Sequence, residues 1–184
     1  MAGLAKRNKS KGNAMTDETT PAAPAADANS PQVALQAIYL KDVSFESPLG
    51  PLAAGNSQAQ PEVSLSLNTT GNQLAPDLHE VVLAVTVSAK AGENTFYLCE
   101  VKQAGLFVVR GLDQTQLRSV LASFCPTILL PYARQTVSDL VVKGGFPPFL
   151  LPPVNFDSLL EQAIAQQRAE NGDAPPTSDI IALN

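Results

Sequence analysis

The stretch from Pro126 to Asp157 mixes prolines and glycines with apolar residues, and this restricts how the chain can fold. It reads PTILLPYARQTVSDLVVKGGFPPFLLPPVNFD. Proline removes a backbone donor and disrupts helix interiors and central strands, so much of this stretch cannot be one long helix or a buried strand. Its apolar connector, FPPFLLPP at residues 146–153, must be covered by the rest of the fold or serve as a binding surface. This combination points to a protein that binds other chains.

Segments typical of β-strands come first along the chain. Residues 33–45 are rich in strand-forming side chains, and residues 62–67 and 81–88 alternate between apolar and polar types. A turn at residues 91–94 leads into a fourth segment, which starts at Phe96 and reaches Val101 or Val109. Because the connecting turn is short, we expect antiparallel pairing.

Segments with helical spacing follow the strands. Asp113 and Gln116 have the spacing of a capping box, which predicts a helix from about Gln114. Pro126 and Pro131 are expected to bend or interrupt it, and a second piece should run from about Tyr132 to the glycine pair at 144–145. A last helix is predicted with Asn155 or Asp157 as its cap. Strands followed by helices indicate an α+β fold, with the helices packed on one face of an antiparallel sheet.

The length of 184 residues fits one domain with a tail at each end. Residues 1–31 are basic and then rich in Pro and Ala, and we expect them to be disordered. We interpret residues 1–14 as a stretch upstream of a true start at Met15, or as a tag. The folded domain is predicted at 32–168, and residues 169–184 are predicted to be a flexible tail.

The charge distribution excludes one class of partner and favours another. Residues 1–14 hold four of the 12 basic residues and no acidic ones, so the rest of the chain has a net charge of −9. An acidic body is unsuited to nucleic acid, which is bound through clustered Lys and Arg, and it favours basic partners. We expect no signal peptide and no membrane insertion, because the chain lacks an apolar run of the necessary kind.

Residues suited to catalysis or metal binding are scarce. His79 is the one histidine, and Cys99 and Cys125 have no CxxC spacing. We therefore expect no enzyme activity, no metal and no cofactor. Without a secretory signal, the two cysteines are predicted to be reduced, buried side chains in a reducing compartment.

One group of acidic residues is a candidate binding site. Asp42 and Glu46 are four residues apart in a predicted strand, so both should lie on the same face. Glu100 lies in another predicted strand, where Leu98 shares its face. Two interpretations of these carboxylates are open at this point: an ordinary solvated face, or a docking surface for a basic partner.

Six segments of the chain resemble the SecB-type family of bacterial protein-export chaperones. They occur in the family's order and span residues 33–160 approximately, and CPTILLPYAR and PPVNFD are long and specific. The segments are IYLKDVSFESP (38–48), QPEVSLSLNT (60–69), LHEVVLAVTVSA (78–89), FYLCEVKQAGLF (96–107), CPTILLPYAR (125–134) and LPPVNFDSL (151–159).

This resemblance implies a specific function and assembly. Members are cytoplasmic chaperones that bind unfolded preproteins, keep them competent for translocation and pass them to the motor ATPase SecA. Their fold is a four-stranded antiparallel sheet with two helices, assembled as a homotetramer that is a dimer of dimers. An edge strand would pair within the dimer, and the long helix at 114–143 would join the two dimers.

The resemblance also assigns site residues. The family's SecA-contacting positions match Asp42, Glu46, Leu98 and Glu100. Its client-binding groove matches the connector, which gives Phe146, Phe149, Leu150, Leu151 and Phe156 as candidates. The loop at 48–60 departs from the family pattern, since it is small and polar where an aromatic residue is common.

Two alternatives remain open on the sequence. The chain could be a SecB-like chaperone for another client, such as a toxin–antitoxin partner. It could also be a non-catalytic α+β domain that binds a small ligand.

Overall fold

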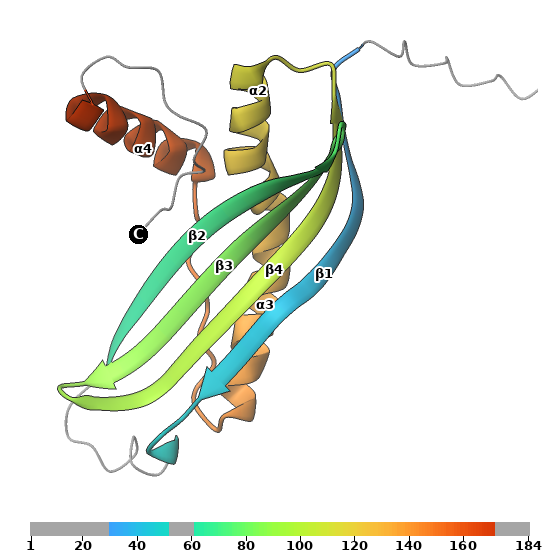
Figure 1. Cartoon of the computed structure of the whole chain (residues 1–184). Coiled ribbons are helices and arrows are strands. Elements are labelled where there is room, and N and C mark those ends of the chain that lie inside the picture. The colour runs from blue at the N-terminus through green and yellow to red at the C-terminus, as the bar shows by residue number, and fades with distance from the viewer. Residues whose placement is uncertain (1–29, 52–60, 172–184) are drawn as a thin grey trace, which may run out of the picture.

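A computed structural model describes residues 30–51 and 61–171, and it contains one antiparallel sheet with helices on one face (Figure 1). The strand order is β1-β4-β3-β2, which leaves β1 and β2 at the edges. In chain order the elements are β1 (Gln32–Glu46), β2 (Glu62–Ala75), β3 (Leu78–Ala91), β4 (Asn94–Arg110), α2 (Gln114–Ser119), the π-helical segment η1 (Val120–Phe124), α3 (Cys125–Lys143) and α4 (Phe156–Asn171). The predicted α+β class and its four strands are confirmed.

The predicted tails lie mostly outside the described residues. Positions 1–29 and 172–184 are not described. Residues 52–60 are not described either, and they belong to the loop at 48–60 whose sequence departs from the family pattern. Helix α4 runs to Asn171, slightly past the predicted start of the C-terminal tail.

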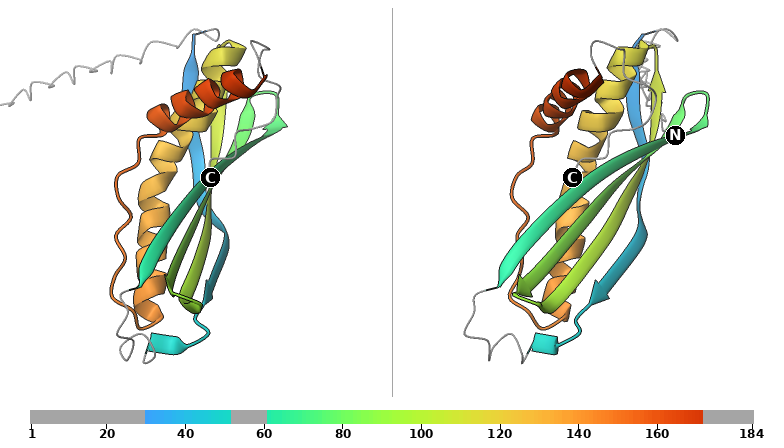
Figure 2. Two further views of the ribbon diagram at one scale, coloured as in Figure 1. Left: turned by 90° about the vertical axis from the view of Figure 1, so that its left-hand side faces the viewer. Right: turned by 60° about the vertical axis from the view of Figure 1, so that its left-hand side comes forward.

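Alternation along the central strands gives the sheet one strongly apolar face. Val81, Leu83, Val85 and Val87 of β3 are all almost fully buried on the side toward α3. Figures 1 and 2 show α3 running along this side of the sheet, while none of the described helices lies on the opposite side. We call the first side the helical face and the second the open face.

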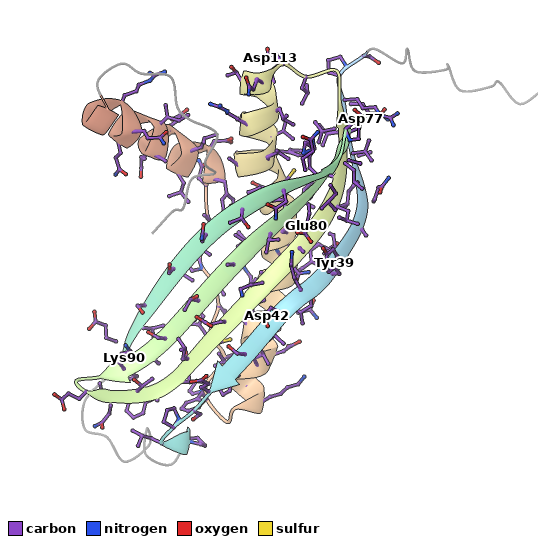
Figure 3. The ribbon with its side chains drawn as sticks, in the orientation of Figure 1. Tyr39, Asp42, Asp77, Glu80, Lys90 and Asp113 are labelled. Carbon is purple, nitrogen blue, oxygen red and sulfur yellow. The ribbon has the colours of Figure 1, made fainter. Side chains whose placement is uncertain are left out.

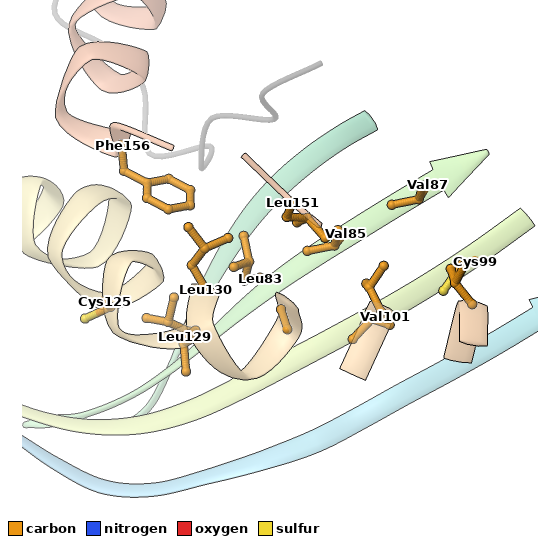
Figure 4. Close-up of a cluster of buried hydrophobic side chains, with 14 of the residues drawn as sticks. Leu83, Val85, Val87, Cys99, Val101, Cys125, Leu129, Leu130, Leu151 and Phe156 are labelled. Carbon is orange, nitrogen blue, oxygen red and sulfur yellow. The ribbon is translucent and has the colours of Figure 1, made fainter. Parts of the chain in front are cut away.

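Helix α3 supplies the other half of the core. Its inward residues recur every four positions and are completely buried: Leu129, Ala133, Val137 and Val141. They pack against side chains of β3 and β4 such as Val85 and Val101 (Figure 4). Gly105 of β4 permits the close approach, because a Cβ atom there would lie 2.9 Å from the Leu129 side chain.

The predicted interruption of the first helix is wrong. Segments α2, η1 and α3 follow one another without a break, so the second piece begins at Cys125 rather than near Tyr132. Pro126 is the second residue of α3 and comes directly after the π-helical turn. The π-helical turn before it carries a longer bond, from the Cys125 N–H to the Val120 carbonyl. Pro131 lies inside α3 but is exposed, and packing of the opposite side on the sheet keeps the helix together.

The predicted helix ends are confirmed. The Asp113 carboxylate accepts from the Gln116 N–H at 2.8 Å, and the Gln116 side chain accepts from the Asp113 N–H at 3.1 Å. Helix α3 stops at Gly144, and Gly145 has a φ of 82° that favours glycine. At α4 the cap is Asn155, whose side chain accepts from the Ser158 N–H at 3.1 Å.

Candidate functional site

The four acidic and apolar positions singled out from the sequence lie together on the open face. In the antiparallel pairing of β1 with β4, Asp42 is opposite Lys102, Ser44 is opposite Glu100, and Glu46 is opposite Leu98. Because residues opposite each other share a face, Asp42, Glu46, Leu98 and Glu100 form one surface. We call these four residues the acidic surface. Their placement on one face is confirmed, whereas their role in binding stays a prediction.

One carboxylate of the acidic surface, that of Asp42, forms an ion pair with Lys102. The Lys102 Nζ is 2.9 Å from the Asp42 Oδ2, and both side chains are more than half exposed. The hydrogen bond and charge of Lys102 lower the pKa of Asp42, and Asp42 in turn raises the pKa of Lys102. Within residues 30–51 and 61–171, neither Glu46 nor Glu100 takes part in an ion pair. Two carboxylates of the surface are thus open to a cationic partner.

A shallow hollow of ≈ 300 Å³ adjoins the acidic surface. Glu46 and Leu98 belong to both, and the hollow continues across β3 toward the β3–β4 turn. Its lining residues are Glu46, Pro48, Thr86, Ser88, Lys90, Thr95 and Leu98. Figure 3 views the open face, with Asp42 on β1 and Lys90 near the turn. Most of these side chains carry a hydroxyl or a charge, but more of the exposed lining surface is apolar than polar.

A second polar group lies on the same face, and the sequence interpretation missed it. The carboxylate of Glu80, on β3, accepts hydrogen bonds from the Tyr39 hydroxyl and from the Lys41 Nζ, the latter at 2.6 Å. Its side chain is 9% exposed, and these two donors, Lys41 first, hold the pKa of Glu80 below its usual range (Figure 3). A carboxylate beside the apolar residues Val81, Val82 and Leu83 was the available signal, because a buried acid needs donors, which here come from β1 across β4.

The connector at 146–153 lies against the rest of the fold. Phe146 is 7% exposed and packs its ring against Tyr97 and Phe45, with centroid distances of 5.0 and 6.4 Å. Leu151 is 3% exposed and lies beside Val85 (Figure 4). The backbone there is also held by Arg134, whose guanidinium donates to the Pro152 carbonyl at 3.4 Å.

Three of the five predicted client-binding residues are therefore core residues. Phe146, Leu151 and Phe156 are buried because they fill apolar space between the sheet and α3, and their role in client binding stays a prediction. The other two remain available. Leu150 is 74% exposed, and Phe149 is partly buried at the edge of the core.

Further exposed apolar side chains lie on the helical segment and on β1. Phe124 and Tyr132 of the helical segment are about half exposed, as are Leu40 and Val43 of β1. Both β1 residues lie on the helical face, since they are opposite Gln103 and Val101, but α3 covers mainly β4 and β3. The outer backbone edge of β1 has no neighbouring strand in the described chain.

The residues with nucleophilic or metal-binding potential are dispersed and buried. Burial raises the pKa of Cys99 to about 11 and that of Cys125 to about 12, so both thiols stay protonated at neutral pH. His79 is also buried, which lowers its pKa. Within the described ranges, no three His, Cys, Asp or Glu side chains gather as a metal site would require. In the same ranges, no helix is both long and apolar enough to span a membrane.

Comparisons with known proteins agree with this geometry. Residues 26–167 match the family model described as preprotein translocase subunit SecB. The protein-export protein SecB of Stenotrophomonas maltophilia is 48% identical over 167 residues, which cover 90% of this chain and 96% of that protein. Its counterpart in Pseudomonas aeruginosa is 47% identical over 165 residues, covering 89% of this chain and 99% of that one.

A solved structure shares the fold at much lower identity. It is a SecB-like chaperone of Mycobacterium tuberculosis in complex with a peptide from an antitoxin. The TM-score is 0.56 at 18% identity, and the match covers 66% of this chain and 90% of that chain.

Proposed function

Because the chain belongs to the SecB family of protein-export chaperones, we propose that it binds unfolded preproteins, keeps them competent for translocation and delivers them to SecA. The observation that carries this proposal is the grouping of Asp42, Glu46, Leu98 and Glu100 on the face opposite the helices of residues 30–51 and 61–171. Near-complete coverage of relatives named for protein export favours this client class over an antitoxin or a small ligand. The work is done by binding alone, without catalysis or a cofactor.

Client binding would use apolar surface and backbone at the helical face. An unfolded preprotein exposes apolar side chains and unpaired backbone, and a folded one hides both. Leu150 and Phe149 offer apolar contacts, and burying them would contribute roughly 25 cal/mol for each Å² of apolar surface. Strand β2 is an edge of the sheet, so its outer backbone groups can pair with an extended segment.

SecA docking would use the acidic surface on the other side of the sheet. Its exposed carboxylates attract a basic partner, and Leu98 adds an apolar contact at one end, opposite Glu46. Attraction between exposed charges is screened by salt, with a Debye length of about 10 Å at 0.1 M. SecA binding should therefore weaken as ionic strength rises.

The cytoplasm is the compartment that we propose for these steps. The free and buried thiols of Cys99 and Cys125 are compatible with reducing conditions.

Reversing the charge of the acidic surface should weaken SecA binding strongly. We expect the triple substitution Asp42→Lys, Glu46→Lys and Glu100→Lys to weaken SecA binding at least tenfold at low salt, since it replaces attraction by repulsion. Calorimetric titration with purified SecA measures this, and binding of an unfolded precursor is the internal control. Wild-type affinity for SecA in the triple variant would leave the carboxylates as a merely solvated face.

Adjacent leucines in the connector separate client binding from stability. Leu151→Ala should lower the free energy of unfolding by about 2–5 kcal/mol, because it opens a cavity in the core. Leu150→Ala should change it by about 0.5 kcal/mol or less, because that side chain is exposed. Urea denaturation followed by circular dichroism gives both values.

The Leu150→Ala variant then reports on client binding. We expect the wild-type protein to block the refolding of an unfolded secretory precursor, and we expect Leu150→Ala with Phe149→Ser to block it less. A surface substitution away from the connector, Arg168→Gln on α4, is the matched control. Equal affinity of the wild-type protein for the folded and the unfolded precursor would defeat the chaperone proposal.

Assembly as a homotetramer is the third part of the proposal. The unpaired edge of β1 would pair with its copy in a dimer, and exposed apolar side chains of the continuous helical segment, such as Phe124 of η1 and Tyr132 of α3, would join two dimers. Light scattering coupled to gel filtration should give the mass of four chains. A monomer at micromolar concentration would rule this assembly out.

A further inference from the structure

We propose that Lys102 sets the affinity of the acidic surface for a cationic partner, by competing with that partner for the carboxylate of Asp42. This inference rests on the proposed docking role of the surface and adds a residue that determines its strength. Lys102 is thus a built-in counter-ion rather than a contact that favours binding.

The position of Lys102 follows from the strand pairing. It lies directly opposite Asp42, and its Nζ is 2.9 Å from the Asp42 Oδ2. Glu100 is two residues before it on β4, so its side chain is on the same face. The ammonium group of Lys102 therefore lies among carboxylates that a basic partner would use.

The exposure of this ion pair makes it easy to open. Lys102 is 51% exposed and Asp42 is 60% exposed, and exposed pairs are weak because water and salt screen them. A partner's lysine or arginine can therefore take over Asp42, but it must displace the ammonium of Lys102 or approach beside it. Either way, the nearby positive charge weakens the partner's binding.

Lys41 on the same face differs in its environment. It pairs with Glu80, whose side chain is 9% exposed and is also bound by the Tyr39 hydroxyl. Removing Lys41 would leave a buried carboxylate without its charged partner, so that pair serves the structure of β1. Lys102 can be removed without this consequence.

The test compares Lys102→Gln with the wild-type full-length protein. We measure the Kd for purified SecA and, separately, for a hexalysine peptide, at 50 mM and at 500 mM salt. At low salt we expect Lys102→Gln to bind both probes about three- to tenfold more tightly, since one positive charge is removed within several Å of the bound cation. At high salt the difference should largely disappear.

Two control variants separate this effect from a general change of charge. Lys143→Gln removes the same charge at the exposed end of α3, away from the acidic surface, and should leave both Kd values unchanged. In an Asp42→Asn background, the gain from Lys102→Gln should be smaller, because the carboxylate in competition is gone.

The outcomes distinguish this inference from the proposed function. If neither the wild type nor Lys102→Gln binds SecA, but Lys102→Gln binds hexalysine more tightly than the wild type does, the SecA proposal fails and the role of Lys102 stands. If Lys102→Gln matches the wild type for both probes, or gains no more than Lys143→Gln, the role of Lys102 is overturned.

Discussion

Two extra residues in β1 decide which of its side chains face α3. The pairing with β4 shifts by one residue between Leu35 and Ala37 and again between Leu40 and Asp42, so Gln36 and Lys41 are bulges. Each bulge moves the following residues to the other face, because side chains alternate along a strand. Ile38 faces the helices, but Asp42, four residues later, is on the open face. Without the bulge at Lys41, Asp42 and Glu46 would point toward the core and Phe45 away from it.

The bulge at Lys41 is held by side chains as well as by backbone. Lys41 donates to the Glu80 carboxylate, which also accepts from the Tyr39 hydroxyl. The same change of face brings Phe45 to the end of α3, where its ring stacks on Tyr97 and leaves no room for a side chain at Gly144. The placement of the connector and the composition of the acidic surface thus both depend on one extra residue in an edge strand.

Much of this fold could be predicted from the sequence, because its signals are local. The alternation at residues 81–88, the capping box at Asp113 and the glycine stop at 144–145 each depend on neighbours in the chain. The helix that continues through Pro126 and Pro131 could not be predicted in this way, because packing on the sheet overrides the local preference of proline. The prediction that Asp42 and Glu46 share a face relied on strand alternation, and it holds because no bulge lies between these two residues.

The sequence alone could not predict which residues of the connector are exposed or which charged side chains form ion pairs. Leu150 and Leu151 are identical in type and adjacent, yet one is exposed and the other buried, and only the packing of the whole chain decides which. The ion pair of Asp42 with Lys102 requires the register of β1 against β4, which the bulges set.

We propose that one sheet separates two binding surfaces, with clients on the helical side and SecA on the open side. The most direct measurement is the affinity of SecA for the protein before and after it is loaded with an unfolded precursor. Sedimentation of the mixture reports the complexes that form. The account predicts a ternary complex and a SecA Kd that changes by about twofold or less, since the two sites do not overlap. Displacement of SecA by the precursor, with no ternary complex, would contradict it.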